Sequence, residues 1–158
     1  MRSSLIELTV NDEEREFLVP PGTTLLNALR DQLGLTAAKR GCEQGTCGTC
    51  TCLLDGDPVM SCLVPVETAQ GSQVTTLEGI TRPDGSLDEV QQAFLDGFAT
   101  QCGFCTAGMI MAAEALLERD PDPTREDVVR AISGNVCRCT GYESIIRAIL
   151  DAADRMAA

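Results

Sequence analysis

The stretch that most constrains this chain is GCEQGTCGTCTC, residues 41–52, which carries four cysteines and three glycines. So many thiols in one loop indicate a disulfide staple, a redox dithiol, a zinc site or an iron–sulfur cluster. The chain has nine cysteines and no histidine, which removes imidazole ligands and histidine-dependent nucleophilic catalysis. Any metal bound here is therefore held mainly by sulfur.

Spacing divides eight of the nine cysteines into two groups of four. The first group has the C-x4-C-x2-C…C spacing of plant-type [2Fe–2S] proteins, with its members at Cys42, Cys47, Cys50 and Cys62. A thioredoxin-type pair opens a helix, and four-thiolate zinc sites usually join two short C-x2-4-C units, so both fit this spacing poorly. An iron–sulfur cluster is therefore predicted. Three glycines are expected to let the backbone approach this cluster and turn its N–H groups toward the sulfurs: Gly41, Gly45 and Gly48.

The second group is less specific, because C-x2-C followed by C-x-C could also hold zinc. Its members are Cys102, Cys105, Cys137 and Cys139. Both pairs fall at the ends of predicted helices, where the first N–H groups of a helix can face Cys105 and an anionic cluster. The ninth thiol, Cys52, is predicted to be a small buried apolar residue on a strand, with ligand replacement or oxidation as the alternatives.

The first half of the chain has the pattern of a small α+β unit. Alternating apolar residues predict strands, and Gly, Pro, Asn and Asp mark the turns between them. The expected elements are strands at 5–10 and 15–19, a helix at 25–33 capped by Thr23 or Thr24, a hairpin at 51–64 turning at Asp55-Gly56, and a strand at 74–77. This order fits a β-grasp arrangement.

The second half has the pattern of four helices packed as an antiparallel bundle. Residues 78–87 are polar and rich in glycine and proline, so the boundary is placed there, giving domains at 1–79 and 80–158. The expected helices begin at the capping-box spacing Ser86–Glu89, span the apolar segment 106–117, begin at the second capping signal Thr124–Asp127, and span about 143–156.

Charge and hydropathy limit the partners and the compartment. The net charge is −12, from 24 acidic and 12 basic residues, so no basic surface for nucleic acid or anionic lipid is expected. No apolar run approaches the roughly 20 residues of a membrane span, and the start MRSSLIELTV lacks a secretory signal. A cytoplasmic location is expected, where structural disulfides are disfavoured.

Three stretches carry a resemblance to a known family: GCEQGTCGTC…LLDGDPVMSCL, QCGFCTAGMIM and GNVCRCTGY. Their order and spacing, and the length of the chain, resemble the small iron–sulfur subunit of molybdenum hydroxylases, the xanthine oxidase family. Bacterial carbon monoxide, nicotinate, isoquinoline, aldehyde and xanthine dehydrogenases are of this type. The resemblance extends over essentially the whole chain.

The resemblance implies a β-grasp, plant-ferredoxin-like domain with one [2Fe–2S] cluster on the first cysteine group, then a four-helix domain with a second on the other group. It implies that the second cluster lies beside molybdopterin, in its cytosine dinucleotide form, on a large subunit. FAD lies on a medium subunit, the complex is a dimer of heterotrimers, and electrons leave singly through both clusters. The residues implied on the pterin side are Gln101, Gly103, Phe104 and Cys139.

Two positions depart from the family pattern: Ala107 stands where proline is common, and Cys52 where an aliphatic residue is usual. The expected function is an electron relay with no substrate chemistry on this chain. The alternatives are a free ferredoxin-like carrier and a regulatory or scaffolding iron–sulfur protein. A plain ferredoxin ends near residue 80, so the helical half with QCGFC favours the relay.

Overall fold

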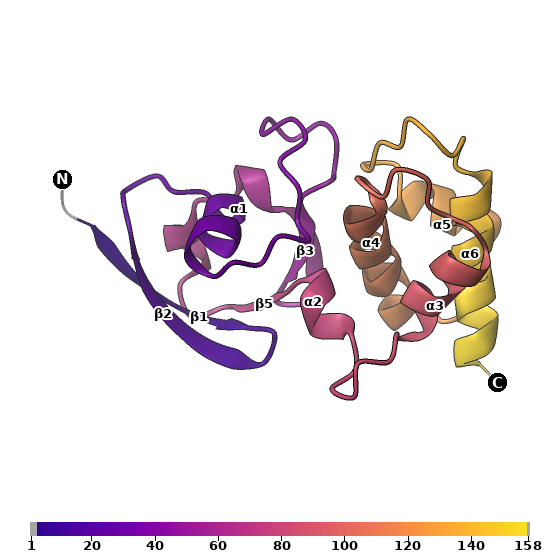
Figure 1. The fold of residues 1–158 in the computed structure, drawn as a ribbon, viewed down its shortest axis with the longest axis horizontal. Coiled ribbons are helices and arrows are strands. Elements are labelled where there is room, and N and C mark those ends of the chain that lie inside the picture. Colours follow the sequence, from indigo (N-terminus) through magenta and orange to yellow (C-terminus); the bar gives the residue numbers. More distant parts are fainter. Residues whose placement is uncertain (1–2, 158) are drawn as a thin grey trace.

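The chain folds into a five-stranded mixed sheet followed by a bundle of helices, which lie side by side in Figure 1. This computed structural model describes residues 3–157. The strands are β1 (Ser4–Val10), β2 (Glu13–Val19), β3 (Thr51–Leu54), β4 (Asp57–Met60) and β5 (Gln73–Thr75). Their order across the sheet is β2-β1-β5-β3-β4, with β1 and β5 parallel and the other pairs antiparallel.

The first two predicted strands pair as a hairpin, and the predicted hairpin at 51–64 is present with its second strand ending at Met60, where a 3-10 turn over Ser61–Leu63 begins. In β1, Ile6, Leu8 and Val10 are buried on one face, as their alternation predicts. The β1–β2 turn holds Asn11 and Asp12 at φ of 52° and 63°, and the β3–β4 turn holds Asp55 and Gly56 at 51° and 84°. Positive φ at both central residues is the geometry of a tight primed turn, which matches the right-handed twist of the strands.

One face of the sheet is covered by the expected helix, which is α1 (Leu25–Asn27) continued by a π-helical segment (Ala28–Gln32). The hydroxyl of Thr24 caps it by accepting the N–H of Asn27 at 3.2 Å. Leu33 N–H reaches the Ala28 carbonyl at 3.2 Å, so the final turn is wider than an α-helical one. A short helix on a mixed sheet of this order confirms the β-grasp prediction.

The last strand is shorter than predicted. We expected a strand at 74–77, but β5 ends at Thr75 because the Asn11 side chain accepts the Thr76 N–H at 2.9 Å. Leu77 then opens the short helix α2 (Leu77–Ile80), inside the segment expected to be a polar linker. Leu77 and Ile80 pack against both Leu53 of the sheet and the helical core, so this segment joins the two halves.

The four expected helices are present as α3 (Glu89–Asp96), α4 (Thr106–Arg119), α5 (Arg125–Ala131) and α6 (Glu143–Met156). Helix α4 lies between the sheet and the other helices in Figure 1, and nine of its 14 residues are buried. Met109, Ile145 and Ile149 are fully buried in the bundle core, each worth roughly 1.5–3 kcal/mol. No helix within residues 3–157 is long and apolar enough to cross a membrane.

The first helix of the bundle starts later than its predicted cap. We expected Ser86 and Glu89 to form the capping box, but Asp88 and Gln91 form it, each side chain accepting the backbone N–H of the other. Ser86 instead donates its hydroxyl to Asp84 at 2.6 Å, while Glu89 pairs with an arginine. The other predicted box, Thr124 with Asp127, is confirmed.

Glu114 on α4 is expected to make the fold less stable as the pH rises toward neutrality. Burial, and then the carboxylates of Asp88, Glu89 and Glu118, raise the pKa of Glu114 to about 7 from its ordinary value of 4.5. The folded chain therefore keeps a proton here that the unfolded chain has lost. Stability falls between pH 4.5 and about 7 and stays lower above that, by about 3 kcal/mol.

The Glu114→Gln variant tests this expectation, because glutamine keeps the shape but has no charge. Its melting temperature should exceed that of the wild type at about pH 8 and approach it at about pH 4. Asp154→Asn, which changes an exposed carboxylate on α6 that is not among the groups acting on Glu114, is the matched control and should leave the pH profile unchanged. A Glu114→Gln profile parallel to that of the wild type would show that Glu114 does not cause the loss.

Candidate metal centres

All nine cysteines lie within the described residues as free thiols, and eight of them gather in two places. The loop before β3, the loop before α4 and the loop between α5 and α6 lie at the same end of the molecule, at the top of Figure 1. The first loop carries three members of the first cysteine group, and the other two loops carry the second group. Both groups are thus presented on one side of the protein.

In the first group the sulfurs are arranged in pairs. Cys42 and Cys47 lie beside each other, as do Cys50 and Cys62, near enough for Cys47 to affect the pKa of Cys42 and for Cys50 to affect the pKa of Cys62. The second pair is positioned by Ser61, whose hydroxyl donates to the Cys50 carbonyl at 2.7 Å and so ties the end of β4 to the cysteine loop. Cys50 and Cys62 are buried, whereas Cys42 and Cys47 are half-buried. One side of this group therefore faces the protein interior and the other faces outward.

The three predicted glycines of this loop lie where no larger residue fits. A Cβ on Gly41 would lie 2.7 Å from the Cys47 sulfur. A Cβ on Gly45 would lie 2.4 Å from Leu63, and one on Gly48 would lie 2.4 Å from the Gly134 carbonyl. Gly45 and Gly48 also have φ of 75° and 68°, which other residues rarely adopt.

Backbone N–H groups point at the sulfurs of the first group. Thr46 N–H lies 3.4 Å from the Cys42 sulfur. The pKa of Cys42 is lowered to about 6, most strongly by the Thr46 hydroxyl and then by the N–H groups of Gln44 and Thr46. Burial raises the pKa of Cys62 to about 11. Metal ligation needs thiolates, so the N–H groups favour the ligating form at Cys42, and at Cys62 the metal must displace the proton.

The second group is built from the start of α4 and the α5–α6 loop. Cys139 donates its thiol to Cys102 at 3.5 Å, and Cys105 lies beside Cys137, near enough to affect its pKa. Cys105 is the N-cap residue of α4, so the first N–H groups of this 14-residue helix begin at the site. Tyr142, at φ 70°, turns its hydroxyl back to accept the Cys137 N–H at 2.9 Å, which fixes the loop.

The two pairs of the second group differ in exposure. Cys105 and Cys137 are buried, and burial raises the pKa of Cys105 to about 12. Cys102 and Cys139 are exposed, and their shared hydrogen bond raises the pKa of Cys139. The residues implied on the pterin side surround this exposed pair, with Gln101 and Phe104 exposed and Gly103 half-buried. The second group therefore has one edge open to a partner.

Paired sulfurs suit a binuclear cluster, in which each iron takes two thiolates. Two thiolates on one tetrahedral metal are about 3.7 Å apart for metal–sulfur bonds of about 2.3 Å, and the Cys102–Cys139 separation of 3.5 Å is close to this. Within residues 3–157, no three cysteine or carboxylate side chains converge on one point as a single ion would require. The donor sets fit [2Fe–2S] clusters.

Three residues of the site were not predicted from the sequence. Asn135 and Gly108 lie where the first cysteine loop meets the helices, and Tyr142 supports Cys137. The signal for Asn135 was its place in GNVCRC, directly before the Val136–Cys137 dipeptide. Cys52 has no exposed surface and lies in the sheet core, where burial raises its pKa to about 12, so its prediction as a buried residue is confirmed.

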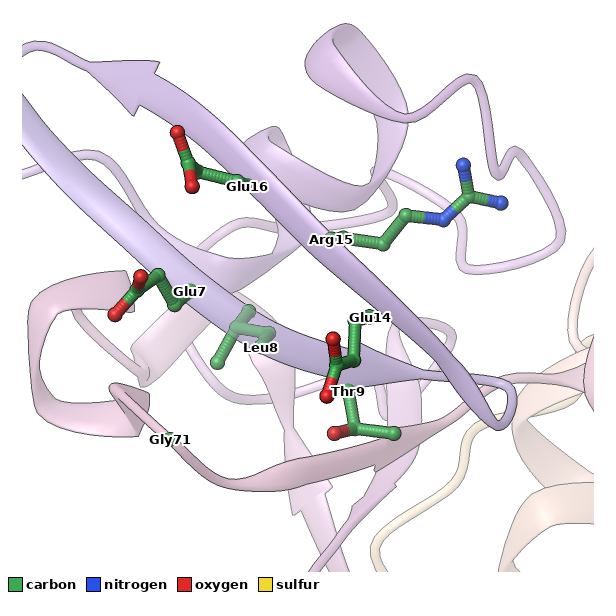
Figure 2. Close-up of a pocket in the computed structure, with 7 residues that line it drawn as sticks. All are labelled: Glu7, Leu8, Thr9, Glu14, Arg15, Glu16 and Gly71. Atoms are coloured by element: carbon green, nitrogen blue, oxygen red, sulfur yellow. The ribbon is translucent and has the colours of Figure 1, made fainter.

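A surface hollow elsewhere contains none of these thiols. It lies along the β1–β2 hairpin and has a volume of about 480 Å³ (Figure 2). Glu7 and Glu16 face each other across the two strands, and the Gln70 side chain donates to Glu7 at 3.1 Å. Its lining is Glu7, Leu8, Thr9, Glu14, Arg15, Glu16 and Gly71. These side chains offer no set of metal ligands or nucleophiles.

The sequence matches two family models, one for each half of the chain. Residues 8–77 match the 2Fe-2S iron-sulfur cluster binding domain, and residues 76–150 match the [2Fe-2S] binding domain. The nicotinate dehydrogenase small FeS subunit of Eubacterium barkeri is 46% identical over 157 residues, covering 99% of both chains. The resemblance of the two sequences is therefore end to end.

Solved structures agree with this relationship. In the structure of quinoline 2-oxidoreductase from Pseudomonas putida 86, one chain superposes with a TM-score of 0.94 at 44% identity, covering 99% of this chain and 98% of that one. Aldehyde oxidoreductase from Desulfovibrio desulfuricans gives 0.93 at 44% identity, covering 97% of this chain but only 17% of that longer chain. The chain belongs to the small [2Fe–2S] subunits of the xanthine oxidase family of molybdenum hydroxylases.

Proposed function

We propose that this chain carries single electrons from a molybdopterin centre on a large subunit, through two [2Fe–2S] clusters, to FAD on a medium subunit. The observation that carries the proposal is the hydrogen bond from the Val136 N–H to the Cys47 carbonyl, 2.9 Å long, which links the two cysteine groups directly. Two one-electron sites in contact suit a link between a two-electron oxidation and a flavin.

The proposed ligands follow the pairs of sulfurs. One cluster takes Cys42 with Cys47 on one iron and Cys50 with Cys62 on the other. The second takes Cys102 with Cys139 and Cys105 with Cys137. When bound, these clusters supply the electron storage. The chain supplies thiolates, N–H groups that stabilise them, and a setting that is buried on one side of each group. We propose the division into domains at 1–79 and 80–158, with one cluster in each.

The molybdopterin is expected on the side of the second group. Support comes from exposure, because Cys102 and Cys139 are open to solvent and Gln101 and Phe104 lie beside them. Gly103, at φ 79°, lets the loop turn between them. The cofactor is proposed to be the cytosine dinucleotide form, held by the partner. Bond chemistry on the substrate is proposed to stay with that partner.

The proposed assembly is a dimer of heterotrimers with large and medium subunits, in the cytoplasm. The aldehyde oxidoreductase comparison supports a large partner, because there the equivalent of this chain is 17% of a longer polypeptide. The acidic surface, with net charge −12, supports the absence of nucleic acid among the partners.

Phe98 is expected to be an anchor for the molybdenum subunit. Its side chain is 83% exposed, and its φ of 48° is unusual for a bulky residue. Cys102 of the second cysteine group lies only four positions further along the chain. Phe98→Asn removes the apolar surface, and asparagine tolerates the positive φ of this position. We expect it to keep its iron and lose most co-purifying molybdenum. Leu18→Asn, which changes an exposed residue on β2, is the control.

Equal molybdenum recovery in the two variants would contradict a role for Phe98 in docking. Loss of iron from Phe98→Asn would show instead that the substitution disturbs the second cysteine loop. Iron and molybdenum analysis of the same preparation therefore separates the two explanations.

The proposed function is tested by purifying the tagged chain gently from its native host and analysing metals, flavin and partners. We expect two co-purifying subunits, one bringing molybdenum and the other FAD. A chain that emerges alone, with iron but neither cofactor, would contradict the relay and favour a free carrier.

A further inference from the structure

One contact joins the backbones of the two cysteine groups. Cys47 belongs to the first group, and its carbonyl accepts the N–H of Val136 at 2.9 Å. Val136 directly precedes Cys137 of the second group. A path along the chain from the Cys47 sulfur to the Cys137 sulfur therefore crosses covalent bonds and a single hydrogen bond. Whatever fixes this hydrogen bond also fixes the separation of the two groups.

Asn135 lies directly beside that contact and is only 6% exposed. Its side-chain amide donates to the Gly48 carbonyl at 2.9 Å and to the Thr51 hydroxyl at 3.2 Å. Thr51 in turn donates its hydroxyl to the same Gly48 carbonyl at 2.7 Å. A buried amide with satisfied donors holds its partners in one arrangement, because breaking its bonds leaves buried polar groups unpaired.

The backbone segments around Asn135 are closely packed. A Cβ on Gly48 would lie 2.8 Å from the Asn135 Cα, and one on Gly108 of α4 would lie 2.2 Å from the Gly48 carbonyl oxygen. The Gly48–Thr49 peptide, which directly follows the Cys47–Gly48 peptide contacted by Val136, is thus held between α4 and the α5–α6 loop. Asn135 is the side chain that ties the peptide to that loop, and neither the relay nor cluster ligation uses it.

We propose that Asn135 is a positioning residue that holds the Gly48 carbonyl, and with it the adjoining Cys47–Gly48 peptide, against Val136 and thereby sets the electronic coupling between the two cysteine groups. This rests on the proposed function, since it requires a cluster on each group. The step that depends on Asn135 is the transfer of one electron, in which one side is oxidised and the other reduced. No bond is made or broken, and no proton is transferred.

The test uses the chain loaded with its clusters, reduced by dithionite and measured by EPR at low temperature. Two reduced clusters close to each other split each other's signals, and this splitting depends on their separation and on the bonds between them. In Asn135→Ala we expect both signals at their wild-type g values and a full iron content, with the splitting diminished or lost. A purely stabilising residue would lower the melting temperature without changing the splitting.

Two further variants sharpen the result. Ser133→Ala, in the same loop, removes an exposed hydroxyl that donates to the Arg130 carbonyl at 2.8 Å, and should keep the splitting. Thr51→Val removes one partner of the Asn135 amide with little change of shape, and should diminish the splitting even if Asn135→Ala fails to load iron.

The outcomes separate this inference from the function on which it rests. Wild-type protein with fewer than two signals refutes the two-cluster function itself. Two wild-type signals without splitting refute the coupling that Asn135 is proposed to set. Splitting that survives in both Asn135→Ala and Thr51→Val refutes the role of Asn135 alone.

Discussion

Replacing Gly41 with alanine is expected to abolish one of the two clusters. The new Cβ would lie 2.7 Å from the Cys47 sulfur and 2.6 Å from the Thr49 hydroxyl, which is well inside van der Waals contact. The sulfur would have to leave its position, and its 3.2 Å hydrogen bond with Thr49 would be lost. We expect Gly41→Ala to purify with about two irons instead of about four, and with only the EPR signal of the second group.

The matched control for this variant is Gly134→Ala. Gly134 lies at the junction of the two cysteine groups, but a Cβ there would meet only the terminal methyl of Met60, at 3.4 Å. It should keep its full iron and both signals. If Gly41→Ala also keeps both, the close packing around Cys47 is not needed for the cluster, and the loop can relax around the added methyl group.

The second large effect is expected at Gly108, within α4. Gly→Ala inside a helix ordinarily stabilises a protein by about 1 kcal/mol. Here the Cβ would lie 2.2 Å from the Gly48 carbonyl oxygen, which is backbone held by hydrogen bonds and cannot swing aside. Overpacking of this kind costs roughly 2–3 kcal/mol and outweighs the gain in helix propensity.

Gly108→Ala should therefore melt about 5 °C below the wild type, by calorimetry of the holoprotein. Its EPR splitting between the clusters should also change, because the added methyl group separates α4 from the cysteine loop. Gly134→Ala again serves as control, with no large loss of stability expected. A melting temperature of Gly108→Ala at or above that of the wild type would mean that the helix and the loop are not rigidly packed.

Local pattern was enough to predict most of the secondary structure. Alternation in β1, the Asp55-Gly56 turn and the Thr124 capping box all depend on neighbouring residues, and the structure contains each of them. The misplaced boundaries have tertiary causes. β5 stops early because Asn11, 65 residues away in the sequence, takes the Thr76 N–H. The segment expected to be a linker contains a helix because Ile80 packs on both halves.

In the candidate site too, local features could be predicted from the sequence and long-range contacts could not. Cysteine spacing was enough to predict two groups of thiols as ligand sets, since the proposed ligand loops are local and the turns between them are marked by glycine. The junction between the two groups could not be predicted. Asn135 and Gly48 are 87 residues apart, and neither a period nor a motif connects them. The steric requirement at Gly108 likewise appears only when α4 lies against the Gly48 carbonyl.

The central claim, that one chain holds two [2Fe–2S] clusters for electron transfer, is most directly tested by metal and sulfide analysis combined with EPR of the reduced protein. We expect about four irons and about four acid-labile sulfides per chain, no zinc, and two distinct spin-half signals. A chain with about two irons and one signal, or with zinc bound at the second cysteine group, would contradict the account.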